Sequence, residues 1–174
     1  MLSNPTNFKL YSLSINRAIV FFRNVGVVHL IFLIIDIYNG FSGIWSTQPH
    51  QFALFLNHII SIPVLFCFSQ YLKNQIENGD LSYIRYKRLI LYCCIVFFPI
   101  VITYHYVEIN TTLSASALVI YILVFGLSLF LNDRLRLLLS LYFAVCYFMI
   151  PIVSGVQYAD NPYLYMIGLS LIHI

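Results

Sequence analysis

Hydrophobic residues fill long uninterrupted runs of this chain, and short polar segments separate the runs. The clearest run starts after Lys87 and Arg88 and ends at His105 and Glu108, with no charged residue in between. An α-helix needs about twenty apolar residues to cross a bilayer core of about 30 Å. The run therefore predicts a membrane-spanning helix over residues 89–107.

The same pattern recurs along the rest of the chain. We expect an all-α fold, a polytopic transmembrane helical bundle that occupies residues 17–168 after a cytoplasmic N-terminal arm of residues 1–16. A sixth span starts at Pro162 and is cut short, since too few residues remain to cross the bilayer. The five complete spans are expected at residues 18–38, 51–71, 89–107, 114–131 and 135–153.

The positively charged residues predict the orientation of the bundle. Lys and Arg beside a span stay in the cytoplasm, and the opposite orientation would place all nine cations outside. We therefore expect a multi-pass membrane protein, with its N-terminus in the cytoplasm and the lipid bilayer around it. The cations are Lys9, Arg17, Arg23, Lys73, Arg85, Lys87, Arg88, Arg134 and Arg136.

Composition agrees with this interpretation, because 61% of the residues are hydrophobic and 9% are charged. A soluble domain has about a quarter charged residues. The net charge is +3, and all nine cations lie in or beside the short segments between spans, where the membrane topology alone accounts for them. We therefore expect no nucleic-acid partner. The four cysteines lie inside apolar runs without C-x-x-C spacing, which favours buried thiols over a zinc site or a disulfide framework. We find no phosphate-binding loop or other catalytic motif, and we expect no catalytic, cofactor-binding or metal-binding residue.

Polar side chains inside the apolar runs are the candidates for a binding site. A charged group in hydrocarbon costs about 3 kcal/mol on insertion scales, so such residues are functional hypotheses by default. Helical spacing puts His29 and Asp36 on one face, and likewise His105 and Glu108. The candidate ligand-binding residues are His29, Asp36, Asn57, His58, Tyr104, His105 and Glu108.

Prolines strengthen this hypothesis, because Pro63, Pro99 and Pro151 lie in three different runs and kinks open space between helices. A small molecule can bind where polar groups border such space. Two interpretations of His29 and His58 stay open: each contacts a ligand, or each hydrogen-bonds a backbone carbonyl of a neighbouring helix. A metal site is disfavoured, since no H-x-x-x-H or H-E-x-x-H pattern brings the histidines together.

Two segments carry a resemblance to a known family. Phe97-Phe98-Pro99-Ile100 leads to Asn110, and Leu129-Phe130-Leu131-Asn132-Asp133-Arg134 leads into Leu137-Leu138-Leu139. These segments, with the layout of six short-looped spans, resemble the third to fifth helices of the α-hydroxyketone quorum-sensing sensor histidine kinases. The resemblance covers about a third of the chain. It implies a location in the bacterial inner (cytoplasmic) membrane and a small apolar signal molecule recognised within the bundle. It also implies a homodimer formed through a cytoplasmic region and a histidine kinase output beyond these residues.

The last six residues, Leu169-Ser170-Leu171-Ile172-His173-Ile174, match the translation of a common transposon adapter used in library preparation. We therefore expect residues 169–174 to be adapter-derived and the reading frame to have been cut there.

The sequence thus favours the N-terminal membrane sensor region of a truncated bacterial signal-transduction protein, a sensor histidine kinase that detects a small apolar signal. One alternative is the sensor region of a diguanylate or adenylate cyclase. Another is a fragment of a small transporter or permease. A third is a membrane-embedded enzyme that uses His58 or His105 as a base.

Overall fold

The computed structural model describes residues 5–79 and 82–112, together with positions 141, 145, 149 and 152. Four helices make up the two continuous ranges, and no strand occurs within them. The spans expected at 114–131 and 135–153 (apart from those four positions), the sixth span from Pro162 and the tail 169–174 lie outside the described residues. The helices are α1 (Pro5–Phe41), α2 (Ile44–Thr47), α3 (Pro49–Glu77) and α4 (Tyr83–Thr112).

Three of these helices, α1, α3 and α4, are long and apolar enough to cross a membrane. They contain the spans expected at 18–38, 51–71 and 89–107, so the prediction of an all-helical membrane protein is confirmed for this part of the chain. Each helix is longer than the expected span. Residues 5–16 of the expected N-terminal arm belong to α1, which continues into the first span without a break.

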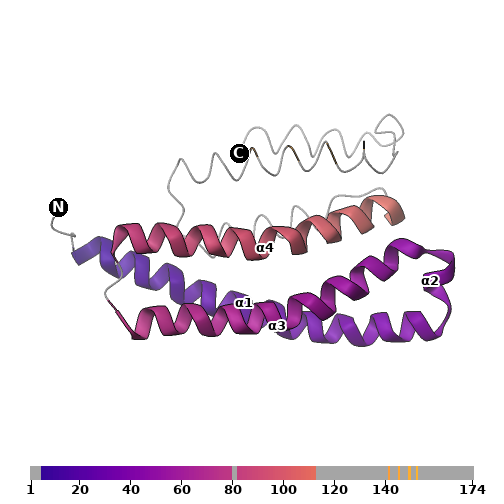
Figure 1. Cartoon of the computed structure of the whole chain (residues 1–174), viewed down its shortest axis with the longest axis horizontal. Helices are drawn as coiled ribbons and strands as arrows, with labels where there is room; N and C mark the ends of the chain where they lie inside the picture. The colour runs from indigo at the N-terminus through magenta and orange to yellow at the C-terminus, as the bar shows by residue number, and fades with distance from the viewer. Residues whose placement is uncertain are drawn as a thin grey trace.

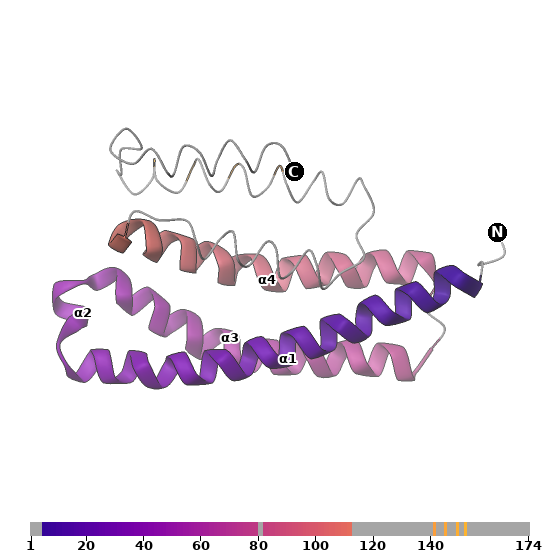
Figure 2. The same cartoon turned by 180° about the vertical axis from the view of Figure 1, so that it is seen from behind.

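The helices run up and down along a common direction. Helix α1 leads to the short helix α2, the chain returns through α3, and α4 runs back beside both (Figure 1). The view from behind shows α1 and α3 crossing each other (Figure 2). Gly43 permits the reversal before α2 because its φ of 77° lies in the left-handed region. Pro49 begins α3, where a missing N–H breaks no hydrogen bond within the helix.

Phe22 of α1 is the centre of the apolar core. Its side chain is fully buried and packs edge-on against Phe68 of α3, with ring centroids 5.0 Å apart. It also packs edge-on against Phe97 of α4 at 6.4 Å. Gly26, one turn further along α1, lets α3 approach closely, because a Cβ there would lie 3.1 Å from the Phe66 ring. The core therefore joins all three long helices.

Besides its apolar core, the bundle has large apolar side chains on its outer surface and several polar side chains inside. Ile34, Ile60 and Ile95, one from each long helix, are 69%, 62% and 58% exposed, whereas His29 and His58 are buried. Large exposed apolar side chains on three helices suit a hydrocarbon environment, and the buried polar groups mark the inside of the bundle.

The positively charged residues of the described helices lie toward one end of the bundle. They occur in the N-terminal half of α1, the C-terminal end of α3 and the N-terminal end of α4, which are adjacent in Figure 1. Tyr11 of α1 stacks on Tyr86 of α4 with ring centroids 4.3 Å apart. Arg85 of α4 donates a hydrogen bond from Nη2 to the Gln75 side chain of α3, at 3.0 Å. These contacts hold the three helices together at that end.

Candidate functional site

Side chains from three helices form one hydrogen-bonded chain in the other half of the bundle. His58 of α3 bonds through Nδ1 to the Asp36 carboxylate of α1 and through Nε2 to the Tyr104 hydroxyl of α4. His58 and Asp36 are buried and Tyr104 is half-buried. We call this chain the Asp36–His58–Tyr104 network.

The helical repeat explains why these residues meet. On α1, His29, Phe32 and Asp36 are spaced at i, i+3 and i+7 and share a face. Helix α3 buries a single stripe of residues spaced by three and four positions, which faces its neighbours. The members of that stripe are His58, Ser61, Leu65, Ser69 and Leu72. The apolar half of this stripe packs in the core, so packing there sets the rotation of α3 and brings His58 toward Asp36.

The network keeps its hydrogen bonds in two protonation states. When the imidazole is neutral, its Nδ1–H donates to Asp36 and Nε2 accepts the Tyr104 O–H. When the imidazole is protonated, both nitrogens donate, and the Tyr104 oxygen becomes an acceptor. The protonated form also neutralises the Asp36 carboxylate, which would otherwise be a buried charge without a counter-ion. The geometry of the two hydrogen bonds therefore suits either form of the imidazole.

His29 lies beside this network without joining it. Its ring is edge-on to His58 with centroids 4.9 Å apart and edge-on to Tyr104 at 5.7 Å. The side chain is fully buried, and neither ring nitrogen has a hydrogen-bond partner in the part of the chain that the structure describes. A buried polar group without a partner costs about 1–3 kcal/mol, so the burial of His29 is energetically unfavourable.

Asn57 precedes His58 on α3 and is only partly satisfied. Its side-chain oxygen accepts a hydrogen bond from the Ser61 hydroxyl at 3.1 Å. Its amide nitrogen is buried and has no hydrogen-bond partner among the described residues. After His29 on α1, Asn57 on α3 is thus a second buried side chain of this region with an unsatisfied polar atom.

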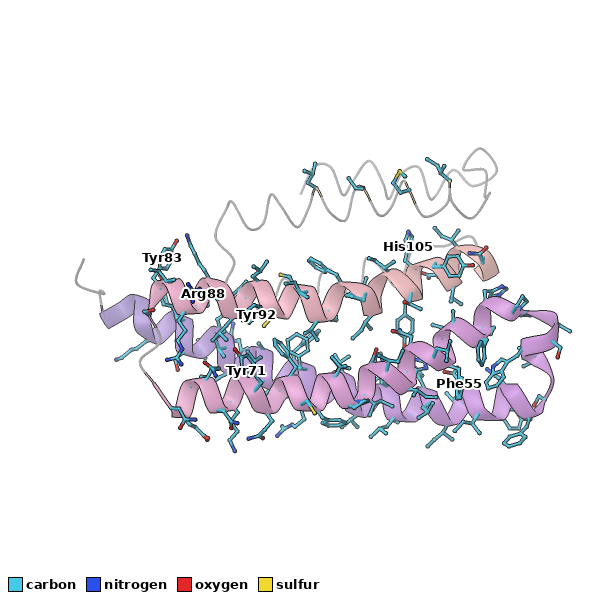
Figure 3. All side chains as sticks on the ribbon, in the orientation of Figure 1. Phe55, Tyr71, Tyr83, Arg88, Tyr92 and His105 are labelled. Carbon is cyan, nitrogen blue, oxygen red and sulfur yellow. The ribbon has the colours of Figure 1, made fainter. Side chains whose placement is uncertain are left out.

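His105 and Glu108 are not part of the network. Figure 3 shows His105 on the side of α4 that faces away from α1 and α3, although its neighbour Tyr104 reaches His58. Consecutive residues of an α-helix differ by about 100° in direction, which explains the separation. His105 is fully buried and interacts electrostatically with Glu108, as their i, i+3 spacing predicts.

Phe32 belongs to the site and was not among the sequence candidates. Its ring lies 5.7 Å from that of His58 and 6.5 Å from that of Tyr104, measured between centroids. It is 37% exposed, so part of its ring reaches the surface of the described bundle. The sequence could have indicated Phe32 by its position, one turn after His29 and one turn before Asp36, because all three residues share a helix face.

The three network residues also lie at similar distances along their helices from the cation-bearing end of the bundle. At about 1.5 Å per residue, Asp36, His58 and Tyr104 each lie about 20–24 Å along the helix from the nearest cation on the cation-bearing side. These reference cations are, in the same order, Arg23, Lys73 and Arg88. Across residues 5–79 and 82–112, no group of three or more His, Cys, Asp or Glu side chains is arranged to hold a metal ion.

No protein-family model, curated protein or solved structure matches the chain.

Proposed function

We propose that this chain is the N-terminal membrane sensor region of a bacterial signal-transduction protein, in which a small apolar signal molecule binds beside the Asp36–His58–Tyr104 network. The observation that carries the proposal is that one imidazole joins three helices. A molecule that competes for either hydrogen bond of His58 alters the packing of α1, α3 and α4 together. Such a change can be passed along the helices to the cytoplasmic side.

The proposed topology has five complete spans and a sixth that begins at Pro162, with the N-terminus in the cytoplasm of a bacterium. The support for this orientation is that the cations of the described helices gather at one end of the bundle, since Lys and Arg remain on the cytoplasmic side. The opposite end carries Trp45, a residue favoured at membrane interfaces. The network then lies in the periplasmic half of the bilayer.

The proposed output is a histidine kinase, and the protein acts as a homodimer through a cytoplasmic region. The support is the resemblance of residues 97–110 and 129–139 to the α-hydroxyketone sensor kinases. A diguanylate or adenylate cyclase would use the same membrane region, and a transporter or permease would instead continue into further spans. The gene sequence that follows Gly168 in the native organism separates these possibilities.

A phosphorylation assay on the full-length protein tests the proposal. We expect the native gene to encode a phosphoacceptor histidine and ATP-binding motifs after the sixth span. In lipid nanodiscs with radiolabelled ATP, we expect His58→Phe to abolish the response of phosphohistidine formation to lipid-soluble extracts of the native culture. The matched control is Ile60→Phe, at a side chain that is 62% exposed on the same helix, and it should respond like the wild type.

Two results would overturn the proposal. The first is a stop codon shortly after the sixth span, because no output domain would then exist. The second is an extract response that His58→Phe leaves intact, because the network would then play no part in sensing. A cyclase domain in place of the kinase would support the sensor role and replace the proposed output.

A further inference from the structure

Two prolines interrupt the backbone hydrogen bonds of α3 and α4 at the same level of the bundle. Pro63 lies five residues after His58 on α3, and Pro99 lies five residues before Tyr104 on α4. The two helices run in opposite directions, and His58 bonds to Tyr104. Both prolines therefore lie about 7.5 Å from that bond, toward the cation-bearing end. Each proline lacks the N–H that would bond the carbonyl oxygen four residues earlier, so both helices are weakened at this level.

The geometry of the helices agrees with a hinge at each proline. Pro63 lies at the middle of α3, and Figures 1 and 2 both show α3 bending toward α4 near its middle. On α4, the Thr103 hydroxyl donates a hydrogen bond to the Pro99 carbonyl oxygen at 2.9 Å, a type of contact that often bends helices. Helix α1 has no proline after Pro5 and passes the same level without a break.

The level of the prolines also separates two kinds of contact between helices. Within the described part of the chain, the apolar core members of α3 all follow Pro63, and those of α4 end at Val101. On the other side of the prolines, α3 joins α4 through the hydrogen bond between His58 and Tyr104. Apolar packing thus holds the cation-bearing half of the bundle, and a directional polar contact holds the half far from the cations.

We infer that residues 100–112 of α4 form a gate that swings about Pro99, and that the hydrogen bond of Tyr104 to His58 is its latch. A hydrogen bond weakens steeply once its geometry is lost, so the latch has a closed and an open state. Asp36 holds His58 against the continuous helix α1. Release of Tyr104 therefore moves the gate away and leaves α3 in place.

The gate goes beyond the proposed function, because it follows from the hinge and the latch and not from the kind of output. In a sensor, the gate converts the loss of one hydrogen bond into a new direction of a helix. In the alternative of a transporter or permease, the same movement opens the half of the bundle far from the cations. The gate can therefore be tested without any signal molecule.

Distances between spin labels test the inference. Leu56 of α3 and Tyr106 of α4 are exposed, and each lies seven residues from the proline of its helix. Both are replaced by p-acetylphenylalanine, which carries a nitroxide and leaves the native cysteines in place. Pulsed electron paramagnetic resonance of the full chain in lipid nanodiscs then measures the distance between the labels. The control pair is Tyr71 and Tyr92, which are exposed in the cation-bearing half (Figure 3).

We expect Tyr104→Phe, which removes the hydroxyl of the latch, to change the distance between positions 56 and 106 by about 4 Å. This is the displacement of a point about 10 Å along a helix that turns by about 20° at its hinge. The control pair should keep its distance. Pro99→Ala restores the missing N–H, so adding it to Tyr104→Phe should return the distance to the wild-type value. Pro5→Ala, at the start of α1, should not do so.

An unchanged distance in Tyr104→Phe would overturn the inference, and so would equal changes in the two pairs. A change that Pro99→Ala leaves in place would refute the hinge. If Tyr104→Phe does not fold, the width of the distance distribution decides: it should be larger for the pair at 56 and 106 than for the control pair, and Pro99→Ala alone should narrow it. A width that Pro99→Ala leaves unaltered would overturn the inference as well.

Discussion

The imidazole of His58 and the carboxylate of Asp36 are hydrogen-bonded across the interface of α1 and α3, and both side chains are almost completely buried. A second pair of an acidic and a basic side chain in the described helices, Lys73 with Glu77, differs from it in distance, position and exposure. Its atoms are 3.8 Å apart, it lies within one helix, and its side chains are 54% and 58% exposed. Exposed pairs contribute little to stability, whereas a buried group that loses its partner is strongly unfavourable.

Removal of either member of the buried pair should therefore destabilise the bundle, and the effects of the two removals should not add. We expect His58→Leu and Asp36→Leu each to lower the free energy of unfolding by about 3 kcal/mol, because each leaves the other group buried without its partner. The double variant should lose less than the sum of the two single variants. Unfolding in mixed detergent micelles measures all three.

The exposed pair supplies the control for that cycle. Lys73→Ala, Glu77→Ala and their combination should each change the free energy of unfolding by less than about 1 kcal/mol. Strict additivity of the Asp36 and His58 substitutions would contradict the hydrogen bond between them.

Tyr104 should contribute through its hydroxyl as well as its ring. Tyr104→Phe keeps the ring contacts with His29 and Phe32 but removes the hydrogen bond to His58, so we expect a loss of about 0.5–1.5 kcal/mol in unfolding free energy. Tyr106→Phe is the matched control, since that side chain lies on α4 two residues later and is exposed. An equal effect of the two substitutions would show that the Tyr104 hydroxyl does not bind His58.

Gly26 should tolerate no large side chain. A Cβ at this position would lie 3.1 to 3.4 Å from atoms of the Phe66 ring, so Gly26→Leu would force α1 and α3 apart. We expect a loss of about 1–3 kcal/mol, the range found when a packed interface is overfilled. Val28→Leu, at an exposed position two residues later, should be close to neutral. Unfolding of both variants in the same micelles gives the comparison, and a neutral Gly26→Leu would argue against close packing at this point.

Hydropathy alone located the three described spans, but it did not predict the full length of the helices that contain them. The apolar run predicts only the part of a helix that lies in hydrocarbon, while backbone hydrogen bonding continues α1 back to Pro5 and α3 on to Glu77. Helix ends in polar segments leave no hydropathy signal, so hydropathy could not place them.

The network residues could be selected from the sequence, but their partners could not. Spacing along α1 predicts that His29 and Asp36 share a face, and it does not state which helix that face meets. The rotation of α3, set by packing around Phe22, decides that His58 meets Asp36. The same limitation applies to His105, which is adjacent to Tyr104 in sequence and lies on another side of α4 (Figure 3).

Cysteine labelling should place the cation-bearing end of the bundle in the cytoplasm. Asn78 follows α3 and Ser46 lies in α2, and both side chains are exposed. The 29 residues of α3 between them extend about 43 Å, which exceeds the bilayer core. In intact cells, we expect a membrane-impermeant maleimide to label Ser46→Cys and to spare Asn78→Cys, and inverted membrane vesicles should give the opposite result. The wild type, whose described cysteines Cys67, Cys93 and Cys94 all lie within the spans, is the background control. Labelling of both variants from one side would show that α3 does not cross the membrane, and the reversed pattern would place the cations outside.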